Sequence, residues 1–136
     1  RRNSFMGYGG SQEYVDSVAD TVLAFMIEKK GAVDNLEEIL SEPGVEMTQW
    51  GGSDFSMGIG KPKQMNAPEV KAAKKKTFEL SMKMGIPTRA EIKSADEMKE
   101  YLDMGVRHFS LGTDILILYT FWKSEGEKVL RAMEGE

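Results

Sequence analysis

Four short apolar stretches alternate with four amphipathic stretches along this chain, and this alternation constrains the fold more than any other feature of the sequence. In the amphipathic stretches, apolar residues recur at intervals of three and four, which is typical of helices with one buried face. The apolar stretches predict strands at residues 21–27, 45–50, 86–92 and 106–111. The amphipathic stretches predict helices at residues 32–40, 68–84, 95–104 and 115–133. We therefore expect four consecutive strand–helix units.

Residues with strong capping preferences mark the start of several helices. Ser11 is the predicted N-cap of an additional helix at residues 12–20. Ser94 and Asp114 are the predicted N-caps of two later helices. Residues 1–10 contain three glycines and no periodic apolar pattern, so we expect a loop there.

Two stretches also carry expectations about burial. The strand at 21–27 is a continuous apolar run, which favours burial on both faces. The helix at 68–84 carries a run of lysines, which we expect to form a solvated face. These lysines are Lys71, Lys74, Lys75 and Lys76.

Alternating strands and helices with short connections are typical of parallel sheets with right-handed crossovers. Two architectures fit: an open, flavodoxin-like doubly wound sheet, or part of a (β/α)8 barrel. Four units cannot close a barrel of eight strands. The sequence also begins at Arg1 and not at a methionine, so we expect a fragment.

The composition excludes several classes of function. The chain has 18 basic and 22 acidic residues and a net charge of -4, so no basic field exists to attract nucleic acid or an anionic membrane. It has no cysteine, which excludes disulfides and thiolate metal sites and is compatible with a reducing cytoplasm. Its longest apolar run is far shorter than a transmembrane helix. We therefore expect a soluble, cytoplasmic protein with no nucleic-acid or membrane partner.

Two carboxylates follow neighbouring predicted strands. Glu28 ends the first strand, and Asp54 follows the second one after two glycines and a serine. Ligands bind at the carboxyl ends of parallel strands, and two carboxylates with waters make an oxygen site that suits Mg²⁺ or Mn²⁺. The alternative is structural: Glu28 forms an ion pair with Lys29, Lys30 or Arg89, and Asp54 caps a turn. The pattern alone leaves both readings open.

Three segments resemble one enzyme family. They are FMIEKKGAVDNLEEIL, GVEMTQWGGSDFSMGIGKP and GVRHFSLGTD. Together they resemble the HpcH/HpaI aldolase/citrate lyase family, which includes 2,4-dihydroxyhept-2-ene-1,7-dioate aldolase and 2-dehydro-3-deoxy-galactarate aldolase. The resemblance runs over nearly the whole chain. It implies a TIM (β/α)8 barrel of the phosphoenolpyruvate/pyruvate type, of which residues 1–136 are a single partial domain holding strands five to eight.

The resemblance implies the residues of the site. In the family, the Glu that ends strand five and the Asp of a Gly-Pro-(Ala/Ser)-Asp loop bind a divalent metal, which implies Glu28 and Asp54 and a cofactor among Mg²⁺, Mn²⁺ and Co²⁺. The backbone of that loop receives the substrate carboxylate, which implies Gly51, Gly52, Ser53 and Asp54. The sequence departs from the family at Gly52, where proline is usual.

The family's catalytic arginine and histidine come from the first half of the barrel, so no catalytic residue is assigned here. Arg89 and His108 are not given those roles. We expect Arg89 to pair with a residue such as Glu91, and His108 to pack or hydrogen-bond near the lower half of the barrel.

The implied activity is that of a class II aldolase, which cleaves a 2-keto hydroxy acid to pyruvate and an aldehyde. Two alternatives stay open: an inactive half-barrel that needs a partner chain, and a lyase of CoA thioesters of the citrate or malyl type. The final helix carries apolar and aromatic residues that must pack on something. In the family this helix is exchanged between subunits, which implies a homo-oligomer, a hexamer built from dimers, unless a complementary N-terminal half covers it.

Overall fold

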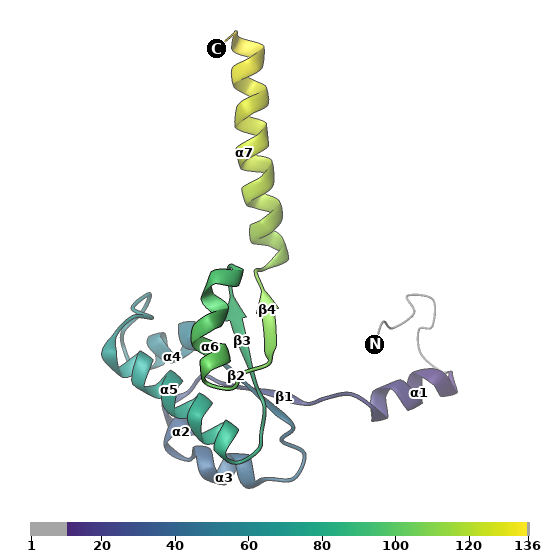
Figure 1. Cartoon of the computed structure of the whole chain (residues 1–136), viewed down its shortest axis with the longest axis vertical. Helices are drawn as coiled ribbons and strands as arrows, with labels where there is room; N and C mark the ends of the chain where they lie inside the picture. Colours follow the sequence, from purple (N-terminus) through teal and green to yellow (C-terminus); the bar gives the residue numbers. More distant parts are fainter. Residues whose placement is uncertain (1–10, 136) are drawn as a thin grey trace.

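The computed structural model describes residues 11–135, in which four parallel strands form one sheet (Figure 1). The strands lie in the order in which they occur along the chain, from β1 to β4, and each pairs in parallel with the next. Their bounds are Ala24–Ile27 (β1), Met47–Trp50 (β2), Thr88–Ile92 (β3) and His108–Leu111 (β4).

At least one helix follows each strand, as the sequence predicts, and the structure adds a short helix, α4, where the sequence predicts a glycine loop. Their bounds are Gln12–Ala19 (α1), Lys30–Asp34 (α2), Leu36–Ser41 (α3), Gly52–Gly58 (α4), Pro68–Lys83 (α5), Met98–Asp103 (α6) and Asp114–Glu134 (α7), with a 3-10 turn, η1, at Ala95–Glu97. The expected loop at residues 1–10 lies outside the described residues.

The sequential strand order and the position of the helices decide between the two predicted architectures. A flavodoxin-like sheet reverses its strand order at a switch point and carries helices on both faces. Here the order has no reversal, and helices α2 to α6 gather on one side of the sheet (Figure 1). This is the arrangement of half of a (β/α)8 barrel.

The core lies between the sheet and these helices. One cluster joins Ile27 to Val33, Leu36, Phe55 and Val70 on the helices that follow β1 and β2. A second cluster joins residues of β3 to the inner sides of α5 and α6. Its buried members are Phe78, Ala90, Ile92, Tyr101 and Val106.

Among residues 11–135, no helix covers the opposite face of the sheet. Side chains alternate between the faces of a strand, so the residues between the core positions point to this inner face, the lumen side of a barrel. The expectation that the first strand is buried on both faces is wrong: Phe25 is 44% exposed and Met26 48% exposed, whereas Ile27 is buried. The physical reason is that β1 is an edge strand and that the helices cover one face only.

Three details of the helices differ from prediction: one helix is broken, one cap makes no hydrogen bond, and one cap lies a residue earlier. The helix expected at 32–40 is divided at Asn35 into α2 and α3. Ser94 precedes η1 but its side chain makes no capping hydrogen bond. Thr113, and not Asp114, is the N-cap residue of α7, and Asp114 accepts a hydrogen bond from the backbone N–H of Ile115 at 2.7 Å. The predicted cap at Ser11 is confirmed, since its side chain accepts from the N–H of Tyr14.

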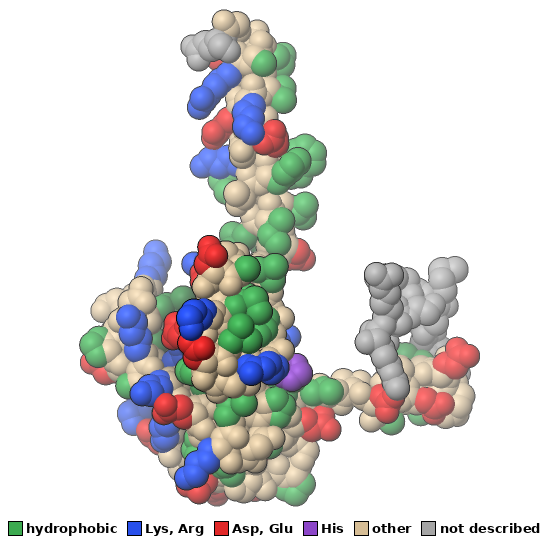
Figure 2. Space-filling view, viewed as in Figure 1, with side chains coloured by type: hydrophobic (Ala, Val, Ile, Leu, Met, Phe, Trp, Pro, Cys, Tyr) green, Lys and Arg blue, Asp and Glu red, His purple; other side chains and the backbone are tan. Residues whose placement is uncertain are grey.

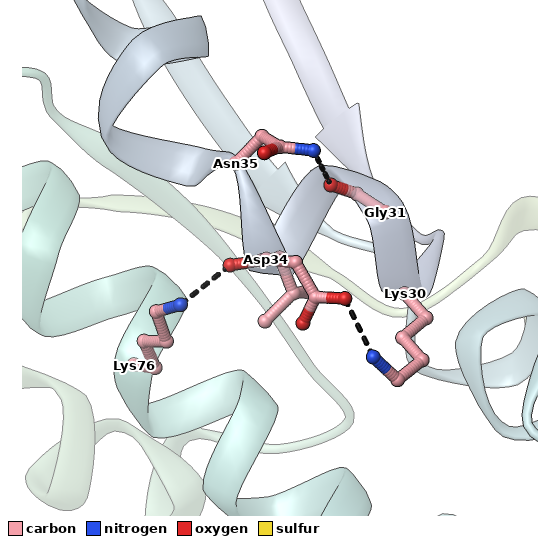
Figure 3. A network of polar contacts seen from close by, with 6 residues as sticks. Lys30, Gly31, Asp34, Asn35 and Lys76 are labelled. Carbon is pink, nitrogen blue, oxygen red and sulfur yellow. Dashed lines mark hydrogen bonds and ion pairs between the residues drawn. The ribbon is translucent and has the colours of Figure 1, made fainter.

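The lysines of α5 are only partly a solvated face. Lys74 donates to the hydroxyl of Tyr101 at 2.6 Å, and its Nζ lies 4.5 Å from the centre of that ring. Lys76 donates to the backbone carbonyl of Val33 at 2.6 Å, beside the Lys30–Asp34 ion pair of α2 (Figure 3). The prediction that all four lysines face water is therefore wrong for Lys74, which is half-buried, whereas Lys76 is exposed and also ties α5 to α2 through its hydrogen bond.

Helix α7 projects from the body of the molecule (Figure 1). Its large apolar side chains are 56–79% exposed, and Figure 2 shows them along the helix. They are Ile115, Leu116, Ile117, Leu118, Tyr119, Phe121, Trp122, Val129, Leu130 and Met133. None of the helices within residues 11–135 combines the length and the apolarity needed to cross a membrane.

Candidate functional site

The two predicted metal carboxylates lie at the carboxyl ends of neighbouring strands. Glu28 directly follows β1, and Gly51 directly follows β2. The backbone N–H of Gly51 donates to the carbonyl of Ile27 at 3.0 Å, so the pairing of the two strands continues to their ends. Glu28 and Gly51 are therefore neighbours across the sheet.

The side chain of Glu28 lies against Gly51. A Cβ atom at Gly51 would lie 2.6 Å from the Cβ and 3.0 Å from Oε2 of Glu28, and 3.0 Å from Cγ of Met26. Real Cβ atoms do not make contacts below 3.0 Å. Glycine is required at this position because the Glu28 side chain occupies the space that any other residue would fill.

Asp54 lies in the first turn of α4, where it is the third residue of the helix. The predicted loop at 51–54 is thus mostly helical, because residues 52–54 already belong to α4. Phe55, the next residue, is buried and packs its ring 4.9 Å from that of Trp50. This contact fixes α4, and with it Asp54, to the end of β2. Asp54 itself is half-buried.

Gly52 stands where the family usually has proline, and Trp50 explains the difference. A Cβ atom at Gly52 would lie 2.8 Å from Nε1 and 3.4 Å from Cδ1 of Trp50. Proline carries a Cβ atom, so the indole ring of Trp50 leaves no room for it. With Trp50 at the end of β2, glycine fits at position 52 and proline does not.

The predicted structural ion pair of Glu28 is present with one of its three possible partners. The Nζ of Lys29 lies 3.5 Å from Oε1 of Glu28. Lys30 instead pairs with Asp34, and Arg89 donates to Gln49. The Lys29 side chain is 66% exposed, so this pair is solvated and of modest strength.

The residues present fit a divalent cation. Glu28 and Asp54 offer hard oxygen ligands, and the absence of a side chain at Gly51 leaves room for the Glu28 carboxylate. Within residues 11–135 no group of three or more His, Cys, Asp or Glu side chains could hold a metal ion. Two carboxylates are the kind of ligand that suits a cation that keeps its remaining positions for waters and a substrate.

A polar network that the sequence did not predict lies on the inner face of the sheet. Arg89 donates to Oε1 of Gln49, and Nε2 of Gln49 donates to Oε1 of Glu91. Arg89 was expected to pair with a residue such as Glu91, and the structure places Gln49 between them. The Nε of Arg89 is buried and has no hydrogen-bond partner among the residues from 11 to 135.

His108 is the first residue of β4 and pairs in register with Arg89. It thus lies at the amino end of its strand, which is the expected lower half of the barrel. Its side chain is exposed on the uncovered inner face, and the packing or hydrogen bond expected for it there stays a prediction.

A comparison of sequences decides the family. The profile described as HpcH/HpaI aldolase/citrate lyase matches residues 3–119. The chain belongs to this family. Curated relatives of this HpcH/HpaI chain include the hydroxypyruvate/pyruvate aldolase of Sagittula stellata, which is 27% identical over 114 residues, or 83% of this chain and 45% of that protein. The 2-keto-3-deoxy-L-rhamnonate aldolase of Escherichia coli K12 is 26% identical over 111 residues, or 81% of this chain and 42% of that protein.

Solved structures agree on the fold of this HpcH/HpaI chain. The citrate synthase SbnG matches with a TM-score of 0.79 and 20% identity, over 98% of this chain and 56% of that one. An HpcH/HpaI aldolase of Desulfitobacterium hafniense matches with a TM-score of 0.73 and 23% identity, over 93% of this chain and 53% of that one. The chain thus spans about half the length of the proteins it matches.

Proposed function

We propose that this chain is the metal-binding and keto-acid-binding half of a class II aldolase, which cleaves a 2-keto hydroxy acid to pyruvate and an aldehyde. The observation that carries the proposal is the close approach of Glu28 to Gly51, since it brings a carboxylate to the start of the helix that holds Asp54. Membership of the HpcH/HpaI family and the relatives named as aldolases support it.

In this proposal Glu28 and Asp54 hold a divalent metal, which is Mg²⁺, Mn²⁺ or Co²⁺. The bound metal supplies a Lewis acid that polarises the keto oxygen of the substrate. Glu28 reaches this position across Gly51, and Asp54 is held there by the packing of Phe55 on Trp50. Uncharged residues therefore position both carboxylates: Gly51 leaves room for Glu28, and Phe55 anchors the turn that carries Asp54.

The segment from Gly51 to Asp54 receives the carboxylate of the substrate. The N–H groups of Gly52, Ser53 and Asp54 are in the first turn of α4, where helix geometry leaves such groups without an intrahelical acceptor. They orient the keto acid so that its keto oxygen faces the two metal ligands.

The other half of the site belongs to the part of the barrel that this sheet lacks. We propose that β1 to β4 are strands five to eight, and that the first four strands bring the arginine and the histidine of the reaction. The uncovered inner face and the half-exposed side chain of Met26, which lies on that face beside Gln49, support a partner surface there.

We also propose a homo-oligomer, in which α7 packs on a neighbouring subunit. The exposed apolar side chains of α7 support this, because such a surface is rarely left in water.

The experiment uses the complete polypeptide that carries this chain. We expect Mn²⁺ binding by isothermal titration calorimetry and metal-dependent release of pyruvate in a coupled retro-aldol assay. Glu28→Gln and Asp54→Asn each remove a ligand and are expected to weaken Mn²⁺ binding by 10-fold or more, on the order of 1.4 kcal/mol. Glu100→Gln on α6 is the matched control and leaves both readouts unchanged. Full Mn²⁺ affinity in Glu28→Gln would exclude the proposed site.

A further inference from the structure

Glu91 lies on the same face of the sheet and in the same row as the proposed metal ligand Glu28. Gln49 pairs in register with Arg89, and Ile27 pairs with Trp50. Two residues beyond Arg89 is Glu91, and two residues beyond Gln49 is Gly51. Glu28 and Glu91 therefore flank Gly51 from the two neighbouring strands, each about 4.8 Å from β2.

Gln49 holds the carboxylate of Glu91 in place. Gln49 is 4% exposed, and its amide accepts from Arg89 through Oε1 and donates to Oε1 of Glu91 through Nε2. Both ends of the amide are thus bound, which fixes its orientation. The hydrogen bonds run from the guanidinium of Arg89 through Gln49 to the carboxylate of Glu91. The positive charge of Arg89 therefore stabilises the negative charge of Glu91.

One oxygen of Glu91 is left for another group. Oε1 accepts from Gln49, whereas Oε2 has no hydrogen bond to any residue between 11 and 135. Glu91 is exposed on the inner face. It does not complete a metal cluster with the other carboxylates of residues 11–135. Glu91 is thus held at one oxygen, has its other oxygen available, and is not one of the two proposed metal ligands. Its available oxygen can accept a hydrogen bond from a substrate in the proposed keto-acid site.

We propose that Glu91 determines the specificity of this site, which rests on the proposed aldolase function. Of two nucleophilic keto acids that such an aldolase could use, Glu91 favours hydroxypyruvate, whose carbon 3 carries a hydroxyl group, over pyruvate, whose carbon 3 is a methyl group, and pyruvate remains a substrate with a lower kcat/KM. A hydroxyl donates to the free carboxylate oxygen, whereas a methyl group leaves that oxygen without a partner once the substrate has displaced water. Gln49 and Arg89 are positioning residues, because they act only through Glu91.

A purely structural role is the alternative, in which Glu91 serves only to satisfy the buried amide of Gln49. The two roles differ in what they predict. A structural role changes stability and leaves the preference between two keto acids constant. A specificity role changes the preference and leaves metal binding constant.

The test measures kcat/KM for hydroxypyruvate and for pyruvate as the nucleophile, with one aldehyde and Mn²⁺, in the complete polypeptide. Hydrogen bonds to charged groups predict a preference for hydroxypyruvate of about 10- to 100-fold. Glu91→Leu is expected to abolish the preference, and Gln49→Leu to reduce it by releasing Glu91. Glu91→Gln keeps the shape and an acceptor, so it retains part of the preference. Glu100→Leu on α6 is the matched control.

Mn²⁺ affinity, measured on each variant by calorimetry, separates this inference from the function on which it rests. Unchanged Mn²⁺ affinity with a lost preference supports the role of Glu91. Unchanged preference in both Glu91→Gln and Glu91→Leu overturns it and leaves the aldolase proposal standing. Should Glu91→Leu fail to fold, Glu91→Gln alone decides. Absence of turnover with either keto acid in the unsubstituted protein overturns the proposed function and this inference with it.

Discussion

At the scale of single residues, the site is shaped by two glycines that give space to their neighbours. Gly51 leaves room for the Glu28 side chain, and Gly52 leaves room for the indole ring of Trp50. Neither requirement follows from backbone conformation, because neither glycine has a positive φ. The identity of these residues is set by contacts across the sheet and along the strand end.

Gly51→Ala provides the residue-scale test. The added Cβ would meet the Cβ of Glu28 at 2.6 Å and its Oε2 at 3.0 Å, so the Glu28 side chain must move away from the start of α4. We expect Mn²⁺ affinity to fall by 10-fold or more, on the order of 1.4 kcal/mol. Calorimetric titration with Mn²⁺ measures it.

Gly31→Ala is the matched control. Gly31 lies in α2, and a Cβ there would meet no atom within 4 Å. The alanine should leave Mn²⁺ affinity unchanged and stabilise the helix by up to about 1 kcal/mol. Equal Mn²⁺ affinities of the two alanine variants would contradict the steric argument.

At the scale of elements, the sequence predicts the strands and most of the helices because periodicity and flanking glycines are local signals. It does not predict the break at Asn35 or helix α4, where a glycine loop was expected, since both depend on packing. The sequence also does not predict how far the side chains of the first strand are exposed. An apolar run is compatible with two buried faces, but Phe25 and Met26 remain half-exposed where the sheet has no neighbour and no cover.

The candidate site was predictable in part. Glu28 and Asp54 stand out because each follows a strand, and the resemblance adds the loop between them. The network of Gln49, Arg89 and Glu91 was not predicted, because its members come from two strands that helices α4 and α5 separate in the sequence. Alternation along β2 and β3 places them on one face, and only the register brings them into contact.

An ion pair between Lys61 and Glu69 joins the end of α4 to the start of α5 and predicts a pH dependence. The hydrogen bond from Lys61 lowers the pKa of Glu69 from its ordinary value of 4.5. A carboxyl group with a lowered folded-state pKa stabilises the fold above its unfolded value and loses that contribution as the pH falls through the lowered pKa. Stability should therefore fall below about pH 4.5 by a component that depends on this pair.

Thermal unfolding midpoints between pH 7 and pH 3 measure this component. Glu69→Gln and Lys61→Met each remove it, so their midpoints should fall less steeply with acid than that of the unsubstituted chain. Identical slopes for all three proteins would show that the pair has no part in the acid response of the α4–α5 connection.

At the scale of the whole molecule, two surfaces are left uncovered by the part of the chain that the structure describes: the inner face of the sheet and helix α7. The inner face is polar in the middle, where Gln49, Arg89 and Glu91 are bonded to one another. Helix α7 is different, because its exposed residues are apolar. Ile115, Leu118, Tyr119, Trp122 and Val129 recur at intervals of three, four and seven, so they lie on one side of the helix.

This stripe predicts that α7 packs on a second subunit. Burial of apolar surface stabilises an interface by roughly 25 cal/mol per Å² before the costs of association, and several large side chains at helical spacing supply that surface. Leu118→Asp places a charge within the stripe, which costs free energy only when the stripe is buried. We expect the complete polypeptide to lose its oligomeric state in size-exclusion chromatography with light scattering. Ser124→Asp, two positions along from Trp122 and therefore on the opposite side of α7, should leave the mass unchanged. If Leu118→Asp and Ser124→Asp had the same mass, α7 would not form the interface. If the unsubstituted protein were a monomer, the apolar stripe of α7 would be covered within one polypeptide.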